Sequence, residues 1–162
     1  MRQTEQNVSP MSNEGRNAYV IQHLTDAFLS LFSQKPINDI SISELVETAG
    51  VGRASFYRNY ESKEDILKAY LNERFLEVKD EWAKNSGAPL SEQVRIMINH
   101  FEKHRSFYQL LNDRGQTYML KDVIIDLCGP KPEYEAVQAY ASAFVAYTLY
   151  GWIDVWFQRG MK

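Results

Sequence analysis

The sequence has a single cysteine and lacks the alternating β-branched runs that are typical of strands. One cysteine, Cys128, among 162 residues excludes an internal disulfide framework and favours a reducing compartment. No positively charged leader followed by an apolar run stands at the N-terminus, so we expect a cytoplasmic protein that is not exported. Apolar residues recur instead at spacings of three and four, which predicts an all-α fold.

Catalytic motifs are also lacking. The sequence contains no glycine-rich phosphate loop, no nucleophile elbow and no paired Cys-His or carboxylate arrangement on a recognisable scaffold. We therefore expect neither enzymatic activity nor a cofactor. An enzyme whose catalytic residues follow none of these motifs stays open as an alternative.

An excess of basic residues is lacking too. The net formal charge is −3, and the first 63 residues hold six lysines and arginines against seven aspartates and glutamates. This balance argues against a protein that coats nucleic acid without selection. The stretch from Gly50 to Lys63 is different, because its basic residues are Arg53, Arg58 and Lys63 and its acidic residue is Glu61 alone. Positive charge is therefore local, and binding to DNA would depend on base contacts, shape and dimerisation.

Residues 41–71 have the pattern of two short helices around a glycine turn, followed by a third, longer helix. Ser41 precedes Glu44 by three residues, which is the spacing of a capping box. Gly50 ends this first short helix, and the second begins near Arg53. The order predicts a helix-turn-helix with a supporting helix behind it.

The second short helix, from Arg53 to Tyr60, has Phe56 as its core residue and donor-rich side chains on its other faces. In a helix-turn-helix this element enters the major groove and its N-terminal residues meet base edges. Arginine can bond guanine bidentately, and asparagine can do the same to adenine. The helix therefore has the side chains needed to read a DNA sequence.

The third helix begins with a cap of its own. Ser62 stands at the N-cap, with Asp65 in the capping-box position. Lys63 follows directly, at a helix N-terminus where its ammonium and the backbone N–H groups together can hold a phosphate.

At this point the sequence closely resembles the DNA-binding domain of the TetR family of transcriptional regulators, from about Ala18 to Leu71. The motifs that carry the resemblance are Ala27-Phe28, Ile40-Ser41-Ile42, Ala49-Gly50-Val51, Ser55-Phe56-Tyr57-Arg58-Asn59-Tyr60 and Glu61-Ser62-Lys63-Glu64-Asp65. The resemblance implies that DNA is contacted by Ser43, Arg53, Ala54, Ser55, Tyr57, Arg58, Asn59 and Lys63. Gly52 departs from the family pattern, which usually has serine or a similar N-cap there, so we expect the recognition helix to fray more easily.

We expect four segments along the chain: a mobile arm (1–15), the helix-turn-helix domain (16–63), a connecting helix and its break (64–89) and an effector-binding and dimerisation domain (90–162). The first helix should span Asn17–Gln34, with Val20, Ile21, Leu24, Phe28, Leu31 and Phe32 buried. The long helix should run from about Lys63 to Asn85. The later helices are expected at Glu92–His104, Ser106–Asn112, Tyr118–Leu127 and Glu133–Arg159, separated by glycine- and proline-containing turns.

The last of these helices allows two interpretations. From Ala136 to Phe157 it is nearly all apolar and long enough to span a bilayer, and a membrane-anchored DNA-binding protein is therefore an alternative. Asp154 would be costly in lipid, and the small residues Ala139 and Ala143 instead favour close helix packing. The resemblance implies that the final two helices pair with those of a second subunit in a four-helix bundle. We expect a homodimer without a membrane span.

The C-terminal domain should sense an effector, either a small molecule or a protein. The candidates for an apolar ligand cavity are Met97, Phe101, Tyr108, Tyr118, Phe144 and Tyr147, and each is also explained as a core residue. His100 and His104 have the i, i+4 spacing of half a metal site. With His23 and Cys128 as the other candidate ligands, we expect no metal site and hydrogen-bonded or solvated histidines instead.

These observations together predict a sequence-specific regulator that binds an inverted-repeat operator in double-stranded DNA. We expect a repressor that a small-molecule effector releases from DNA. A regulator of this kind that is controlled by a protein partner, and that activates transcription, is the alternative.

Overall fold

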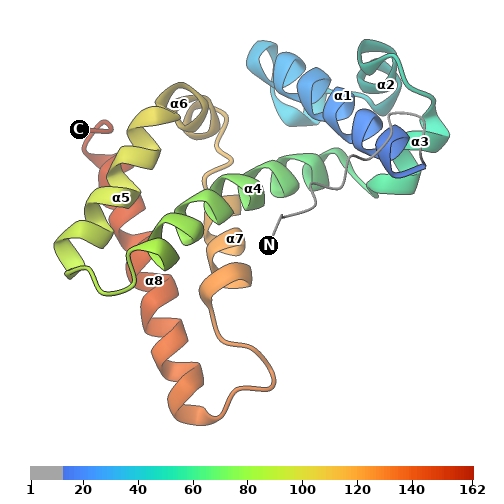
Figure 1. Ribbon diagram of the computed structural model, residues 1–162. Helices are drawn as coiled ribbons and strands as arrows, with labels where there is room; N and C mark the ends of the chain where they lie inside the picture. Colours follow the sequence, from blue (N-terminus) through green and yellow to red (C-terminus); the bar gives the residue numbers. More distant parts are fainter. Residues whose placement is uncertain (1–12) are drawn as a thin grey trace, which may run out of the picture. The chain divides into compact units, whose positions relative to one another are not determined.

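The computed structural model describes residues 13–162. In this part of the chain every regular element is a helix, which confirms the predicted all-α fold. The elements, in chain order, are α1 (Asn13–Gln34), η1 (Ile37–Asp39), α2 (Ile42–Ala49), α3 (Arg53–Asn59), α4 (Lys63–Lys84), α5 (Leu90–Lys103), α6 (Arg105–Asp113), α7 (Tyr118–Cys128) and α8 (Ala136–Gln158). The α-helices carry these labels in Figure 1.

The first compact unit ends at Leu67 and is built on α1, which packs against both α2 and α3. Phe28 and Phe32 lie one turn apart on α1 with their rings stacked at 5.5 Å. Leu45 of α2 and Phe56 of α3 are fully buried with them. Burial of each such side chain contributes roughly 1.5–3 kcal/mol to the free energy of unfolding. This small core therefore holds α3 in place against α1 and α2.

The turn between α2 and α3 depends on Gly50. This glycine has φ +65°, a left-handed conformation, and its N–H donates to Glu47 and Val46. The N–H of Val51 donates to the carbonyl of Val46 at 3.0 Å. In the Schellman motif, which ends many helices, the N–H of the residue after the left-handed one donates to the carbonyl five residues earlier. The predicted glycine turn is confirmed.

The two predicted capping boxes have different outcomes. At α4 both halves form: Ser62 Oγ accepts from the Asp65 N–H at 3.3 Å, and Asp65 Oδ2 accepts from the Ser62 N–H at 2.7 Å. At α2 Ser41 Oγ accepts from the Glu44 N–H at 3.2 Å, but the Glu44 carboxylate binds Lys35 Nζ at 2.6 Å instead of returning to Ser41. An ammonium group attracts a carboxylate more strongly than a backbone N–H does.

The second unit, Lys68–Lys162, contains the rest of α4 and α5–α8. Its α7 and α8 pack together as a helical hairpin, and α5 packs against α6. The core side chains come from all of these helices and include Phe75, Val78, Met97, Phe101, Tyr108, Leu111, Leu120, Val123, Ile124, Leu149 and Ile153. This unit is large enough for a core of its own.

Helix positions were predicted well from sequence, with three corrections. α1 begins at Asn13 rather than Asn17, so the last residues of the expected arm are helical, while residues 1–12 of that arm lie outside the described residues. α8 begins at Ala136 rather than Glu133, because Tyr134 N–H closes a turn onto Lys131 and Glu135 is extended. Ile21, expected in the core, is exposed because the buried side of α1 starts only at Leu24.

The membrane alternative for the last helix finds no support within residues 13–162. None of the helices there, α8 included, combines the length and the apolar character that a membrane crossing requires.

Candidate nucleic-acid interface

The recognition helix α3 has one buried face and one open face. Phe56 is fully buried, whereas the next residue, Tyr57, is 53% exposed. Arg53 and Arg58 lie exposed on the same helix. A seven-residue helix anchored through a single aromatic ring leaves most of its surface free for a groove of DNA.

The structure assigns each predicted DNA-contact residue a level of exposure. The exposed side chains are Ser43, Arg53, Ala54, Tyr57 and Arg58, and the half-buried ones are Ser55, Asn59 and Lys63. Seven of the eight lie on α3 or at the start of α4, and Ser43 lies on α2. All belong to the first compact unit.

Two of the α3 side chains have partners within their own helix. The Arg53 guanidinium lies over the Tyr57 ring, 5.8 Å from its centroid, which is a cation–π contact. Asn59 Nδ2 donates to the Ser55 carbonyl at 2.9 Å. Arg53 is thus partly positioned before any ligand binds, whereas Asn59 must give up an intrahelical bond to read a base with its full amide.

Lys63 has a structural role that the sequence did not reveal. Its ammonium donates to the Ile40 carbonyl at 2.7 Å and to the Asn38 carbonyl at 3.2 Å, so it joins the start of α4 to the end of η1. A lysine ammonium has three donors. Contact of Lys63 with a phosphate stays a prediction, and it has to use the third donor or exchange one of these bonds.

The start of α3 has no side-chain cap. Gly52 occupies the N-cap position with φ −74° and ψ 149°, and no side chain accepts a hydrogen bond from the first turn. This is the backbone conformation of an ordinary N-cap, as the sequence predicted. The N–H of Ser55 donates to the Gly52 carbonyl at 2.9 Å, so an anion at this turn would bind the N–H groups of Arg53 and Ala54.

A hollow of about 700 Å³ lies between the start of α1 and the open side of α3. Its α3 lining is Ser55, Arg58 and Asn59. The α1 lining includes Arg16 and Asn17, which sequence reasoning missed. The expected helix already began at Asn17, and extension of its periodicity by one turn would have added Arg16 to it.

The six predicted ligand-binding residues divide into a buried and an exposed set. Met97, Phe101 and Tyr108 are buried in the second unit, whereas Tyr118, Phe144 and Tyr147 are exposed. Met97 and Phe101 line a hollow of about 160 Å³, and Phe144 lines a different one of about 330 Å³. Periodicity placed all six on helices, but it did not determine which faces meet.

The two histidines of the second unit lie next to each other, with ring centroids 4.8 Å apart. His100 Nε2 is 2.9 Å from the Tyr108 hydroxyl, which fits the expected hydrogen-bonded histidine. Burial lowers the pKa of His100 to about 4, helped by the neighbouring His104. Burial also lowers the pKa of His104, and it raises that of Tyr108. These imidazoles are therefore neutral at neutral pH.

Comparison with known proteins identifies the first unit. The family model of bacterial regulatory proteins of the tetR family matches residues 24–70. This stretch contains the second half of α1, then η1, α2, α3 and the start of α4.

Two curated relatives match part of the chain. The HTH-type transcriptional regulator AcrR of Shigella flexneri is 33% identical over 88 residues, which cover 50% of this chain and 40% of that protein. The HTH-type dhaKLM operon transcriptional activator DhaS of Lactococcus lactis is 22% identical over 86 residues, which cover 53% of this chain and 45% of that protein. The matched stretches thus span less than half of each relative.

Proposed function

We propose that this chain is a transcriptional regulator of the TetR family, whose model matches residues 24–70, and that it binds an operator in double-stranded DNA through α3 and controls transcription from there. The family consists of transcription factors rather than enzymes. The observation that carries the proposal is the open face of α3, which presents Arg53, Tyr57 and Arg58 next to a glycine turn held by a three-helix core. Because bacterial chromosomal DNA lies in the cytoplasm, the proposed activity belongs to that compartment.

The proposed contacts divide into two kinds. Arg58 and Asn59 have side chains suited to base edges, whereas Lys63 and the uncapped first turn of α3 suit phosphates. Arg16 and Asn17, across the hollow from α3, extend this surface onto α1. Phosphate contacts set the position of the helix on the duplex, and base contacts select the sequence.

The regulator acts as a homodimer in this proposal. α8 exposes a series of large apolar side chains that its own unit leaves uncovered, namely Val137, Tyr140, Phe144, Val145, Tyr147 and Val155. An exposed apolar surface of this kind marks an interface. A two-fold dimer carries two recognition helices, and so the operator is an inverted repeat.

Repression relieved by an effector is the proposed sign of regulation. An effector that binds one conformation of the second unit better than another changes the spacing of the two recognition helices, and DNA half-sites tolerate only one spacing. Activation, with control by a protein partner, is the second candidate. A specific observation favours it, because one of the two relatives is a transcriptional activator.

Selection of DNA fragments from a random or genomic pool by the purified chain, at near-physiological salt, tests the proposal. We expect enrichment of an inverted repeat whose half-sites are related by the two-fold axis of the dimer. A folded chain that enriches no sequence, with or without cell extract as a source of effector, would contradict it. A triple variant, Arg53→Ala, Tyr57→Ala and Arg58→Ala, is the matched control, because all three side chains are exposed and their loss leaves the core intact.

A further inference from the structure

Three ligand-type side chains meet in the second unit. Glu77 of α4, His100 of α5 and His104 at the junction of α5 and α6 each place one donor atom within 4.8 Å of the others. Glu77 Oε2 is 3.8 Å from His100 Nδ1 and 3.5 Å from His104 Nε2. Donor atoms around a tetrahedral zinc ion, each about 2.1 Å from the metal, are separated by about 3.4 Å. The cluster is already close to this spacing.

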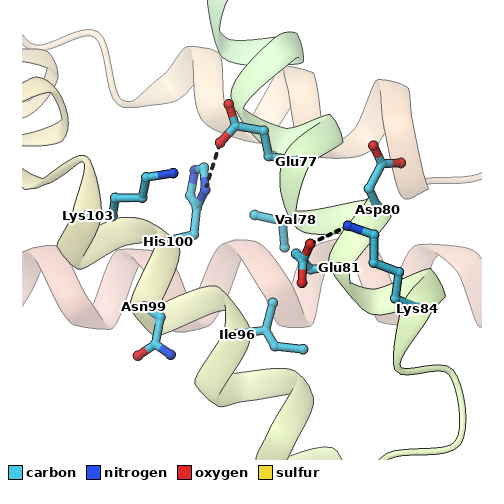
Figure 2. A pocket seen from close by; sticks show the side chains of 9 residues that line it. All are labelled: Glu77, Val78, Asp80, Glu81, Lys84, Ile96, Asn99, His100 and Lys103. Carbon is cyan, nitrogen blue, oxygen red and sulfur yellow. Dashed lines mark hydrogen bonds and ion pairs between the residues drawn. The ribbon is translucent and has the colours of Figure 1, made fainter.

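The donor atoms are aimed at one another and are poorly satisfied by protein. His104 Nε2 is buried, and its one neighbour of opposite charge in the described part of the chain is Glu77 Oε2 at 3.5 Å, the long limit of a hydrogen bond. The separation of His100 Nδ1 from Glu77 is too long for a hydrogen bond. Figure 2 shows the Glu77 carboxylate reaching from α4 toward the His100 ring on α5, at the edge of a hollow of about 480 Å³.

The neighbouring residues hold each ligand in a fixed orientation. Arg74 Nη1 binds Glu77 Oε1 at 2.7 Å and so leaves Oε2 facing the histidines. The Tyr108 hydroxyl, 2.9 Å from His100 Nε2, can accept the N–H of that nitrogen and leave the Nδ1 lone pair facing Glu77. Metal-binding histidines usually donate their second N–H to such an oxygen.

We propose that Glu77, His100 and His104 bind one divalent transition-metal ion per chain. Two imidazoles and one carboxylate are a ligand set for Zn²⁺, Co²⁺ or Ni²⁺, whereas Mg²⁺ and Ca²⁺ require mostly oxygen ligands. Glu77 and His100 also line the hollow of about 480 Å³, so water or a small molecule can supply a fourth ligand from there. The cationic Arg74 and Lys103 lie nearby and oppose a cation, so ions with high affinity for imidazole are selected.

The ion has a regulatory consequence that rests on the proposed function. Binding joins α4 to α5 through metal–ligand bonds, and α4 is the helix that begins at Lys63 in the DNA-binding unit. A ligand that holds α4 against α5 favours one position of that helix over others. In this proposal the metal ion is the effector, or part of it, and it changes the affinity for the operator.

Titration of the chelator-treated chain with Zn²⁺, followed by calorimetry, tests the site itself. We expect one ion per chain, visible absorption of tetrahedral type when Co²⁺ is used, and no binding of Mg²⁺ at the same concentration. Glu77→Gln and His104→Gln should each weaken Zn²⁺ binding by at least about tenfold, as loss of a metal ligand or its supporting partner does. Thermal unfolding without metal should show that both variants still fold.

Two matched controls keep the test specific. Glu81→Gln removes an exposed carboxylate of the same hollow, and His23→Gln removes the histidine of the first unit. Neither should change the affinity for Zn²⁺. Equal Zn²⁺ binding by the wild-type chain, Glu77→Gln and His104→Gln would overturn the proposal, as would a wild-type chain that binds no Zn²⁺.

Operator binding with and without Zn²⁺ then separates the site from its role. A change of operator affinity of about tenfold in the wild-type chain, absent in Glu77→Gln, supports the ion as effector. An operator affinity that Zn²⁺ leaves unchanged overturns that role while the calorimetry still stands. Failure to select any DNA would instead overturn the proposed function and leave the metal site as a separate result.

Discussion

At the scale of single residues, Arg58 and Lys63 have the same charge and different surroundings. Arg58 is exposed on α3 and lines the hollow shared with α1. Lys63 is half-buried, and two of its three donors bind the carbonyls of Ile40 and Asn38. Substitution of Arg58 should therefore affect DNA alone, whereas substitution of Lys63 should affect both DNA and the fold.

Arg58→Ala should weaken binding to the selected operator by about 1–3 kcal/mol and relax the base preference at one position in each half-site. The reason is that a guanidinium reads guanine through two hydrogen bonds, which alanine cannot replace. Binding measured on the operator and on single-base variants checks this. Arg58→Lys is the control, since it keeps the charge but loses the bidentate geometry. A uniform loss on every sequence would assign Arg58 to a phosphate.

Lys63→Ala should weaken binding to all sequences alike. It should also reduce the slope of log affinity against log salt concentration by about one, because one phosphate contact is lost. It should also lower the free energy of unfolding by about 1 kcal/mol, because two carbonyls at the end of η1 lose a charged donor. Urea unfolding and salt titrations of DNA binding measure the two effects separately. An unchanged free energy of unfolding would mean that water replaces the ammonium at no cost.

At the scale of elements, the position of α3 depends on two glycines with different requirements. Gly50 has φ +65°, in the left-handed region, whereas Gly52 has φ −74°, a value that L-residues adopt without strain. A Cβ at either position meets nothing within 4 Å. The difference between the two sites is thus one of backbone conformation and capping, and not of space.

Gly50→Ala should lower the free energy of unfolding by about 1–2 kcal/mol, because an L-residue is strained in the left-handed conformation that ends α2. Chemical denaturation followed by circular dichroism measures this. The loss should be smaller for Gly50→Asn, since asparagine tolerates this region better. Equal losses for alanine and asparagine would point to another cause.

Gly52→Ser should act in the opposite direction and raise the free energy of unfolding by a few tenths of a kcal/mol. A serine hydroxyl at this N-cap accepts from the first turn of α3, which has no side-chain cap now. Hydrogen exchange of the α3 amides is the most direct measurement, and slower exchange is the expected result. Gly52→Ala, which supplies a Cβ but no acceptor, should give no protection.

At the scale of the whole molecule, α8 has an exposed apolar side that no other part of its own unit covers. Tyr140 is 75% exposed and Phe144 is 74% exposed, on a helix whose other side packs against α7. Burial of such exposed apolar side chains against a second copy of the chain would stabilise a dimer. The DNA proposal needs the same dimer, because an inverted repeat offers two half-sites.

Tyr140→Glu should convert the proposed dimer into a monomer, since a carboxylate buried against a partner without a counter-ion is strongly unfavourable. The fold of each chain should be unaffected, because the side chain is exposed within its own unit. Analytical ultracentrifugation and circular dichroism measure the two properties. Gln138→Glu, a neighbouring exposed position on α8, is the charge-matched control. A Tyr140→Glu chain that remains a dimer would place the interface elsewhere.

The sequence by itself determined the features that depend on neighbouring residues. Helix periodicity, the glycine turn at Gly50 and the capping box at Ser62 all involve residues no more than a few positions apart, and each was predicted from that spacing. The motifs of residues 24–70 were enough to predict the family whose model matches this stretch.

Only the tertiary structure decided which side chains from distant positions meet. The Glu44 carboxylate binds Lys35 instead of completing its capping box, and the Lys63 ammonium donates to carbonyls more than twenty residues earlier in the chain. Glu77 joined His100 and His104 across two helices, although the sequence showed only the histidine pair. These contacts depend on how the helices rotate and pack, and the free energy of packing is shared by the whole core, so no local pattern encodes them.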